Sequence, residues 1–161
     1  MGLRLVGHMA VVVILGSASI AVGDDLDLKW SGACRQVEGF VNVLFDATRT
    51  TCIPAGYAAK NGTLMLFADK PVLSVPAAKK AWLFSVVGSV GLVMNDALSL
   101  RCVNVVLVDS EGMQARRGYS LPCPFVKRTQ LDIKVGTLTI EDAWARIEKA
   151  LKPINVQKPK T

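Results

Sequence analysis

The side chains in this sequence that could do chemistry by type and spacing are four cysteines and a single histidine. The cysteines are Cys34, Cys52, Cys102 and Cys123. Zinc sites usually contain closely spaced Cys-x-x-Cys pairs, whereas the nearest two cysteines here are 52 − 34 = 18 residues apart. An even number of widely spaced cysteines in an exported chain is typical of disulfides. We therefore expect two disulfides and no metal site.

Four cysteines allow three pairings, and the local pattern ranks them only in part. Cys34 opens a segment that we expect to be helical to about Asp46, which would carry the chain ~18 Å away at ~1.5 Å per residue. Bridged Cα atoms lie within ~7 Å of each other, so we expect strain in a bridge from Cys34 to Cys52. A bridge from Cys102 to Cys123 is plausible. The pairing of Cys52 with Cys102 and of Cys34 with Cys123 remains open.

A predicted β-hairpin makes the bridge between Cys102 and Cys123 plausible. The run VNVVLV (103–108) is rich in β-branched residues, as strands are. Residues 109–112 (DSEG) are typical of a turn, and residues 116–121 can return antiparallel. Paired residues of an antiparallel hairpin have a constant sum of residue numbers, and 102 + 123 equals 112 + 113. A hairpin that folds between residues 112 and 113 therefore places the two cysteines opposite each other.

The N-terminus predicts export. Arg4 precedes an apolar stretch, and Ala21-Val22-Gly23 places small residues at the positions that a signal peptidase reads. We expect residues 1–23 to be a cleaved signal peptide that directs the protein to the periplasm or out of the cell. The rival interpretation is an uncleaved membrane anchor, because residues 5–23 approach the ~20 residues needed to span a bilayer.

Removal of residues 1–23 would change the chemistry open to the chain. The mature chain would have 161 − 23 = 138 residues, and the loss of Arg4 would lower the net charge from +6 to +5. It would also lose His8, the single histidine, and with it any Ser-His-Asp, Cys-His or histidine-ligated zinc site. A hydrolase that uses two carboxylates, such as Asp109 and Glu111, remains formally possible. We expect no enzyme and no cofactor.

The first half of the mature chain predicts a helix and then a hairpin. Apolar residues at helical spacing predict an amphipathic helix over residues 34–49, which the proline-containing segment 51–56 ends. Asn61-Gly62 suits a type I′ hairpin turn. Pro76 is typical of a helix start, because proline is tolerated in the first turn.

The second half adds two helices to the predicted hairpin. The uncharged run over residues 81–94 predicts a buried central helix, with a hairpin turning at Gly88-Ser89 as the alternative. Thr139 predicts the capped start of a C-terminal helix. We therefore expect a small α+β domain over residues 24–152, stapled by disulfides, with an N-terminal amphipathic helix, a central helix, a β-hairpin and a C-terminal helix. Residues 153–161 are expected to be a flexible basic tail.

A cluster of basic and aromatic residues is the candidate binding surface. It contains Arg116, Arg117, Tyr119, Lys127 and Arg128. Arginine and tyrosine anchor many protein interfaces, and a basic surface favours an acidic partner. An exported chain of mild positive charge does not favour nucleic acid. The alternative is a solvated strand face with no partner.

Several short motifs between residues 34 and 102 resemble the periplasmic immunity proteins of type VI secretion amidase effectors, the resistance-associated or Tai type. These motifs are Cys34, Gly39-Phe40, Cys52-Ile53-Pro54, Pro71, Pro76-Ala77 and Cys102. The sequence departs from the family pattern after residue 102, because the family is mostly helical and residues 103–152 are expected to be rich in strand.

The resemblance implies a function without chemistry. The protein would bind and block a cognate peptidoglycan amidase in the periplasm, and we expect a basic face to dock on an acidic surface of that protein. The alternative is a small envelope stress or chaperone-like protein, or a solute-binding protein, also without catalytic activity.

Overall fold

A computed structural model describes residues 25–55 and 62–156 of the chain. The predicted signal peptide over residues 1–23 lies outside the described residues. Asn61 of the predicted hairpin turn and residues 157–161 of the predicted tail lie outside them as well.

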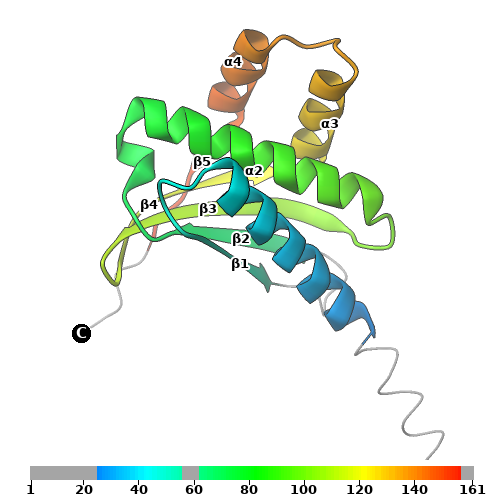
Figure 1. The fold of residues 1–161 in the computed structure, drawn as a ribbon, viewed down its shortest axis with the longest axis horizontal. Helices are drawn as coiled ribbons and strands as arrows, with labels where there is room; N and C mark the ends of the chain where they lie inside the picture. Colours follow the sequence, from blue (N-terminus) through cyan, green and yellow to red (C-terminus); the bar gives the residue numbers. More distant parts are fainter. Residues whose placement is uncertain (1–24, 56–61, 157–161) are drawn as a thin grey trace, which may run out of the picture.

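The strands are β1 (Thr50–Ala55), β2 (Gly62–Ala68), β3 (Cys102–Glu111), β4 (Gln114–Pro122) and β5 (Lys152–Pro153). They form one sheet in the order β1-β2-β3-β4-β5 (Figure 1). Neighbouring strands are antiparallel except β2 and β3, which run parallel. Parallel neighbours need a long crossover connection, and the helix α2 (Pro76–Asp96) supplies it.

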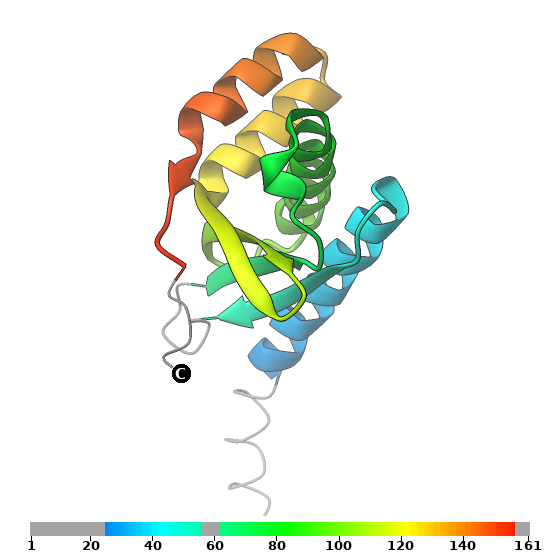
Figure 2. The same ribbon diagram turned by 90° about the vertical axis from the view of Figure 1, so that its left-hand side faces the viewer.

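The helices of the described chain lie over one face of this sheet (Figures 1 and 2). They are the N-terminal helix (residues 25–44), α2, α3 (Cys123–Lys134) and α4 (Ile140–Ala150), and a short 3₁₀ turn, η2 (Val72–Ser74), leads into α2. The predicted α+β class is confirmed. The sequence did not predict α3. It placed the start of the first helix nine residues too late (34 − 25) and its end five residues too late (49 − 44).

The core lies between the sheet and α2. Alternate residues of β2 are buried, and Leu64 and Leu66 are fully inside together with Val105 and Leu107 of β3. This is the period-two pattern expected of strands with one covered face. Trp82 of α2 lies over the same core, and its indole Nε1 donates to Thr50 Oγ1 at 2.9 Å.

The helix α2 is the buried central helix that the run over residues 81–94 predicts, so the alternative hairpin at Gly88-Ser89 is wrong. It is long and apolar enough to cross a membrane, but more than half of its most apolar window is buried against the rest of the fold. A helix that is apolar on nearly all sides is typical of a protein core. We therefore treat α2 as a core helix.

Two disulfides join the helical layer to the sheet. Cys34 of the N-terminal helix pairs with Cys52 of β1, with Cα atoms 5.5 Å apart. Cys102 of β3 pairs with Cys123 at the start of α3, with Cα atoms 5.7 Å apart. The second pairing is the one that the predicted hairpin made plausible, and the open alternative of Cys52 with Cys102 and Cys34 with Cys123 is wrong. The expectation of strain in a bridge from Cys34 to Cys52 is also wrong. An extended chain advances ~3.3 Å per residue against ~1.5 Å in a helix, so a few residues after the helix return the chain to Cys34.

The hairpin of β3 and β4 forms as predicted, but its turn is shorter. The strand β3 continues through Asp109 to Glu111, and the chain reverses at Gly112, whose φ is 62°. The predicted DSEG turn is therefore wrong for its first three residues. A register shift between Asp109 and Ser110 accommodates the reversal.

The strand β1 lies at the edge of the sheet, and side chains of the N-terminal helix cover its free backbone groups. The amide of Asn42 accepts from Thr50 N at 2.7 Å and donates to Thr50 O at 2.8 Å. Glu38 Oε2 accepts from Cys52 N at 2.9 Å. Two positions further on is Pro54, which has no N–H to leave unpaired. The segment that was expected to end a helix is thus a protected edge strand.

The C-terminal helix begins where predicted. Thr139 Oγ1 accepts from Asp142 N at 3.1 Å, which is the expected cap. The chain then differs from the expected flexible tail, because β5 pairs with β4 and Ile154 N donates to Gly118 O at 3.0 Å. A Cβ added to Gly118 would lie 2.7 Å from Ile154, so glycine allows this close approach.

Candidate functional site

The five residues of the predicted basic cluster do not form one surface. The strand β4 has nine residues, so it carries the chain ~30 Å from its first residue to the start of α3. Arg116 and Arg117 therefore lie near the N-terminal end of α2, whereas Lys127 and Arg128 lie near its C-terminal end. Lys127 and Arg128 are on a helix and not on the expected strand face. Two separate basic surfaces result.

The first surface lies at the C-terminal end of α2, and we call it the distal surface (Leu98, Arg101, Lys127, Arg128 and Leu131). These residues line a hollow of about 590 Å³ beside the disulfide of Cys102. Leu98 is 84% exposed and Leu131 is 42% exposed, so two large apolar side chains face solvent among three cations. Sequence reasoning missed Arg101, although it directly precedes a disulfide cysteine.

Hydrogen bonds hold the two sides of the distal surface together. Asn95 of α2 donates through Nδ2 to Lys127 O at 3.2 Å and to Gln130 Oε1 at 2.9 Å, both on α3. Arg128 Nε lies 2.9 Å from Asp132 Oδ1 in an ion pair along the same helix. The described residues contain no ion pair to Arg101 or Lys127. The positive charge of these two side chains is therefore not neutralised by a carboxylate in contact.

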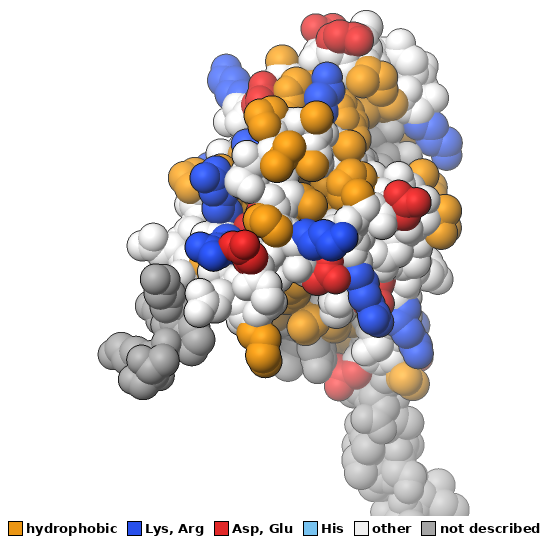
Figure 3. All heavy atoms as spheres, turned by 60° about the vertical axis from the view of Figure 1, so that its left-hand side comes forward, with side chains coloured by type: hydrophobic (Ala, Val, Ile, Leu, Met, Phe, Trp, Pro, Cys, Tyr) orange, Lys and Arg blue, Asp and Glu red, His pale blue; other side chains and the backbone are white. Residues whose placement is uncertain are grey.

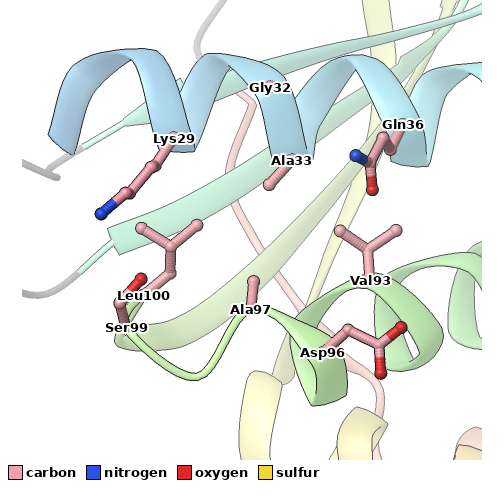
Figure 4. A pocket seen from close by; sticks show the side chains of 9 residues that line it. All are labelled: Lys29, Gly32, Ala33, Gln36, Val93, Asp96, Ala97, Ser99 and Leu100. Carbon is pink, nitrogen blue, oxygen red and sulfur yellow. The ribbon is translucent and has the colours of Figure 1, made fainter. Parts of the chain in front are cut away.

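A second hollow lies on the other side of the loop that carries Leu98. It has a volume of about 400 Å³, and Figure 4 shows it between the N-terminal helix and the end of α2. Lys29 and Asp96 lie on opposite walls, so neither sign of charge dominates. Leu100 lines both this hollow and the hollow beside the distal surface. The loop between α2 and β3 therefore forms a ridge with a depression on each side.

The second basic surface lies at the N-terminal end of α2, and we call it the basic pocket (Lys79, Lys80, Arg117, Trp144 and Glu148). It has a volume of about 500 Å³, with η2 and α2 on one side and β4 and α4 on the other. On this side of the molecule, Lys and Arg side chains, with Asp and Glu side chains among them, lie around a band of hydrophobic side chains (Figure 3). The sequence did not indicate Lys79 and Lys80 as binding residues, because they were interpreted only as part of the helix that starts at Pro76.

Aromatic rings hold the two lysines of the basic pocket. Lys79 Nζ lies 4.9 Å from the centroid of the Tyr119 ring, and Lys80 Nζ lies 5.8 Å from the centroid of the Trp144 ring. Cation–π contacts of this kind fix an ammonium group without neutralising its charge. Tyr119, a predicted partner-binding residue, is half-buried against the core and supports Lys79.

Arg116 and the nearby carboxylates have structural roles. Arg116 is paired with Glu111 across the hairpin turn. Asp109 is fully buried, and its two oxygens accept from Leu73 N at 2.8 Å and Arg117 N at 3.0 Å. The two carboxylates that a hydrolase would use are thus bound to the protein's own groups. Within residues 25–55 and 62–156, no group of three or more Asp, Glu, His and Cys residues could hold a metal ion.

Comparisons of the chain with family models, with curated proteins and with solved structures found no match.

Proposed function

We propose that this protein is an exported, periplasmic binding protein that docks on an acidic protein partner through the distal surface. The observation that carries the proposal is the exposure of Leu98 on a ridge beside Arg101 and Lys127. Apolar anchors next to arginine, with depressions that a partner can fill, are typical of protein interfaces. Arg101 and Lys127 have no carboxylate in contact among the described residues, so an acidic partner would supply one.

The rigidity of the ridge supports the same proposal. Ala97 N donates to Val93 O at 2.9 Å, and Leu100 N donates to Ala97 O at 3.0 Å, so the loop continues the hydrogen bonding of α2. The disulfide from Cys102 to Cys123 then fixes the end of the loop to α3. A surface that is already ordered loses little conformational entropy on binding, which favours tight association.

The disulfides and the predicted signal peptide support the proposed compartment. Two disulfides fit an oxidising extracellular or periplasmic environment. In that compartment, the resemblance of residues 34–102 to immunity proteins suggests that the partner is a peptidoglycan amidase effector. The protein would then act by covering the effector and would need no catalytic group of its own.

The test is binding of the purified mature protein to peptidoglycan amidase effectors from the same genome, beginning with any encoded beside its gene. Isothermal titration should show one-to-one binding tighter than micromolar. The double substitution Arg101→Glu with Lys127→Glu should weaken it at least 100-fold, because two attractive charge contacts become repulsive. The matched control Lys134→Glu with Lys149→Glu makes the same charge change at two side chains away from the ridge and should weaken binding less than about threefold.

Two outcomes would count against the proposal. Binding that weakens equally in both double variants would mean that net charge, and not the distal surface, attracts the partner. Weak binding to many unfolded proteins, with no tight single partner, would favour the chaperone-like alternative.

A further inference from the structure

The basic pocket at the N-terminal end of α2 is unrelated to the distal surface, because α2 has 21 residues and its ends lie ~30 Å apart. Three cations from two separate elements line it: Lys79 and Lys80 from α2, and Arg117 from β4. Within the described residues, none of these three is in an ion pair. Arg116 and Arg128, by contrast, each have a carboxylate partner in the fold.

Like charges gathered in one hollow repel one another, so the fold must hold them there. The rings of Tyr119 and Trp144 hold the two lysines. The backbone of Arg117 is fixed by Asp109, whose other oxygen holds Leu73 on the opposite wall. The buried carboxylate of Asp109 thus ties both walls of the pocket together, and the lining of the pocket is preorganised.

Each element that forms the pocket contributes to its charge balance. Glu148 of α4 lies in the lining and opposes the cations, and the charge of Asp109 is engaged by two backbone N–H groups. The first turn of α2 has no acidic residue and no side-chain cap, so its partial positive charge adds to that of the three cations. The net charge of the pocket is therefore positive, which favours the binding of an anion.

We propose that the basic pocket binds a phosphate group, either inorganic phosphate or the phosphate of a small organic ligand. The planar guanidinium of Arg117 and the ammonium groups of Lys79 and Lys80 line the same hollow, so each offers N–H donors to a phosphate dianion there. A hollow of about 500 Å³ leaves room for an organic group beside Trp144 and Leu73 of η2. This site is separate from the proposed partner surface and does not depend on it.

Tryptophan fluorescence gives a direct readout. The three tryptophans of the chain are Trp30, Trp82 and Trp144, and the first two are 2% and 0% exposed. Trp144 is half-buried and lines the pocket, with Lys80 over its ring. A phosphate that draws Lys80 away from the ring should change the emission of Trp144. The mature disulfide-bonded protein is titrated with inorganic phosphate and, separately, with phenyl phosphate, at constant ionic strength.

We expect saturable binding in the millimolar range or tighter. Lys80→Gln and Arg117→Gln should each weaken it about fivefold or more, whereas Glu148→Gln should strengthen it about threefold. The matched control Lys149→Gln removes the same charge from the next residue of α4, outside the pocket, and should change the affinity less than twofold. Phenyl phosphate that binds more tightly than phosphate would assign an organic ligand, and equal affinities would assign phosphate itself.

Two results would overturn the proposal. One is the absence of a saturable signal for both probes, with ³¹P line broadening also absent as a check that does not depend on Trp144. The other is equal weakening by Lys80→Gln and Lys149→Gln, which would show general surface attraction. Melting curves of each variant confirm that it is folded.

Discussion

The buried carboxylate of Asp109 accepts the backbone N–H of Arg117 at 3.0 Å, across the hairpin of β3 and β4. Its second oxygen accepts from Leu73 N at 2.8 Å, so a single side chain joins β3, β4 and the turn that precedes α2. Buried acceptors of this kind are costly to remove, because the donors that remain lose both water and partner.

Replacement of Asp109 by asparagine should destabilise the protein by about 2–3 kcal/mol, since an amide has one oxygen where the carboxylate has two. Urea unfolding followed by far-UV circular dichroism measures the change. Glu111→Gln is the control, and it should cost less than about 1 kcal/mol because its pair with Arg116 is exposed. If both variants unfold like the wild type while an intrinsic hydrolase activity is lost, the structural role assigned to Asp109 is wrong.

The two disulfides should contribute similarly to stability. The cysteines that they join are 18 and 21 residues apart in the sequence. For loops of this length, the loss of chain entropy in the unfolded state predicts a stabilisation of about 3 kcal/mol by each disulfide. The paired variants Cys34→Ser with Cys52→Ser and Cys102→Ser with Cys123→Ser separate the two contributions in denaturant titrations. A melting temperature that reducing agent leaves unchanged would contradict this prediction.

Asn42 should protect β1 from pairing with other molecules. Asn42→Ala frees the N–H and C=O groups of Thr50 at the edge of the sheet. We expect a loss of about 1–2 kcal/mol in unfolding free energy and an increase in self-association, measured by light scattering. Gln36→Ala lies on the same helix and serves as control. Equal scattering from both variants would mean that the edge is protected in another way.

Two glycines of α2 should respond to alanine with opposite signs. A Cβ at Gly91 would lie 2.3 Å from Gln130 Cβ, where α2 and α3 approach closely, so Gly91→Ala should cost about 1–3 kcal/mol. A Cβ at Gly88 would meet nothing within 4 Å, so Gly88→Ala should gain about 0.5–1 kcal/mol from helix propensity. Thermal melts of the two variants test the difference in sign, and two changes in the same direction would refute it.

Protonation of Asp69 should lower the stability of the protein in acid. Thr48 donates to its carboxylate through Oγ1, and this bond, with the Arg49 N–H, lowers the pKa of Asp69 below its ordinary value of 3.8. A lowered pKa stabilises the fold above about pH 4, and this contribution is lost as the pH falls below it. Between pH 5 and about pH 3, the melting temperature of the Asp69→Asn variant should therefore fall by less than that of the wild type. Identical losses would mean that the bond from Thr48 has no energetic effect.

The local patterns of the sequence determined several elements directly. The uncharged run in α2, the β-branched run in β3 and the Thr139 cap each follow from interactions among residues close in the chain. The same patterns concealed α3, because residues 116–121 were expected to form a strand and Lys127 and Arg128 were assigned to the same strand face. They also concealed β1, because Pro54 resembled a helix end, although proline is tolerated on an edge strand.

The placement of the basic residues was decided by the tertiary structure. Arg117 and Lys127 are ten residues apart in sequence, yet β4 carries them to opposite ends of α2, because an extended strand gains about twice the distance of a helix per residue. The pairing of Cys34 with Cys52 was decided in the same way. The sequence by itself determined the fold class, the presence of disulfide cysteines and a positive charge. Which cations share a pocket depends on long-range strand pairing, which local spacing does not contain.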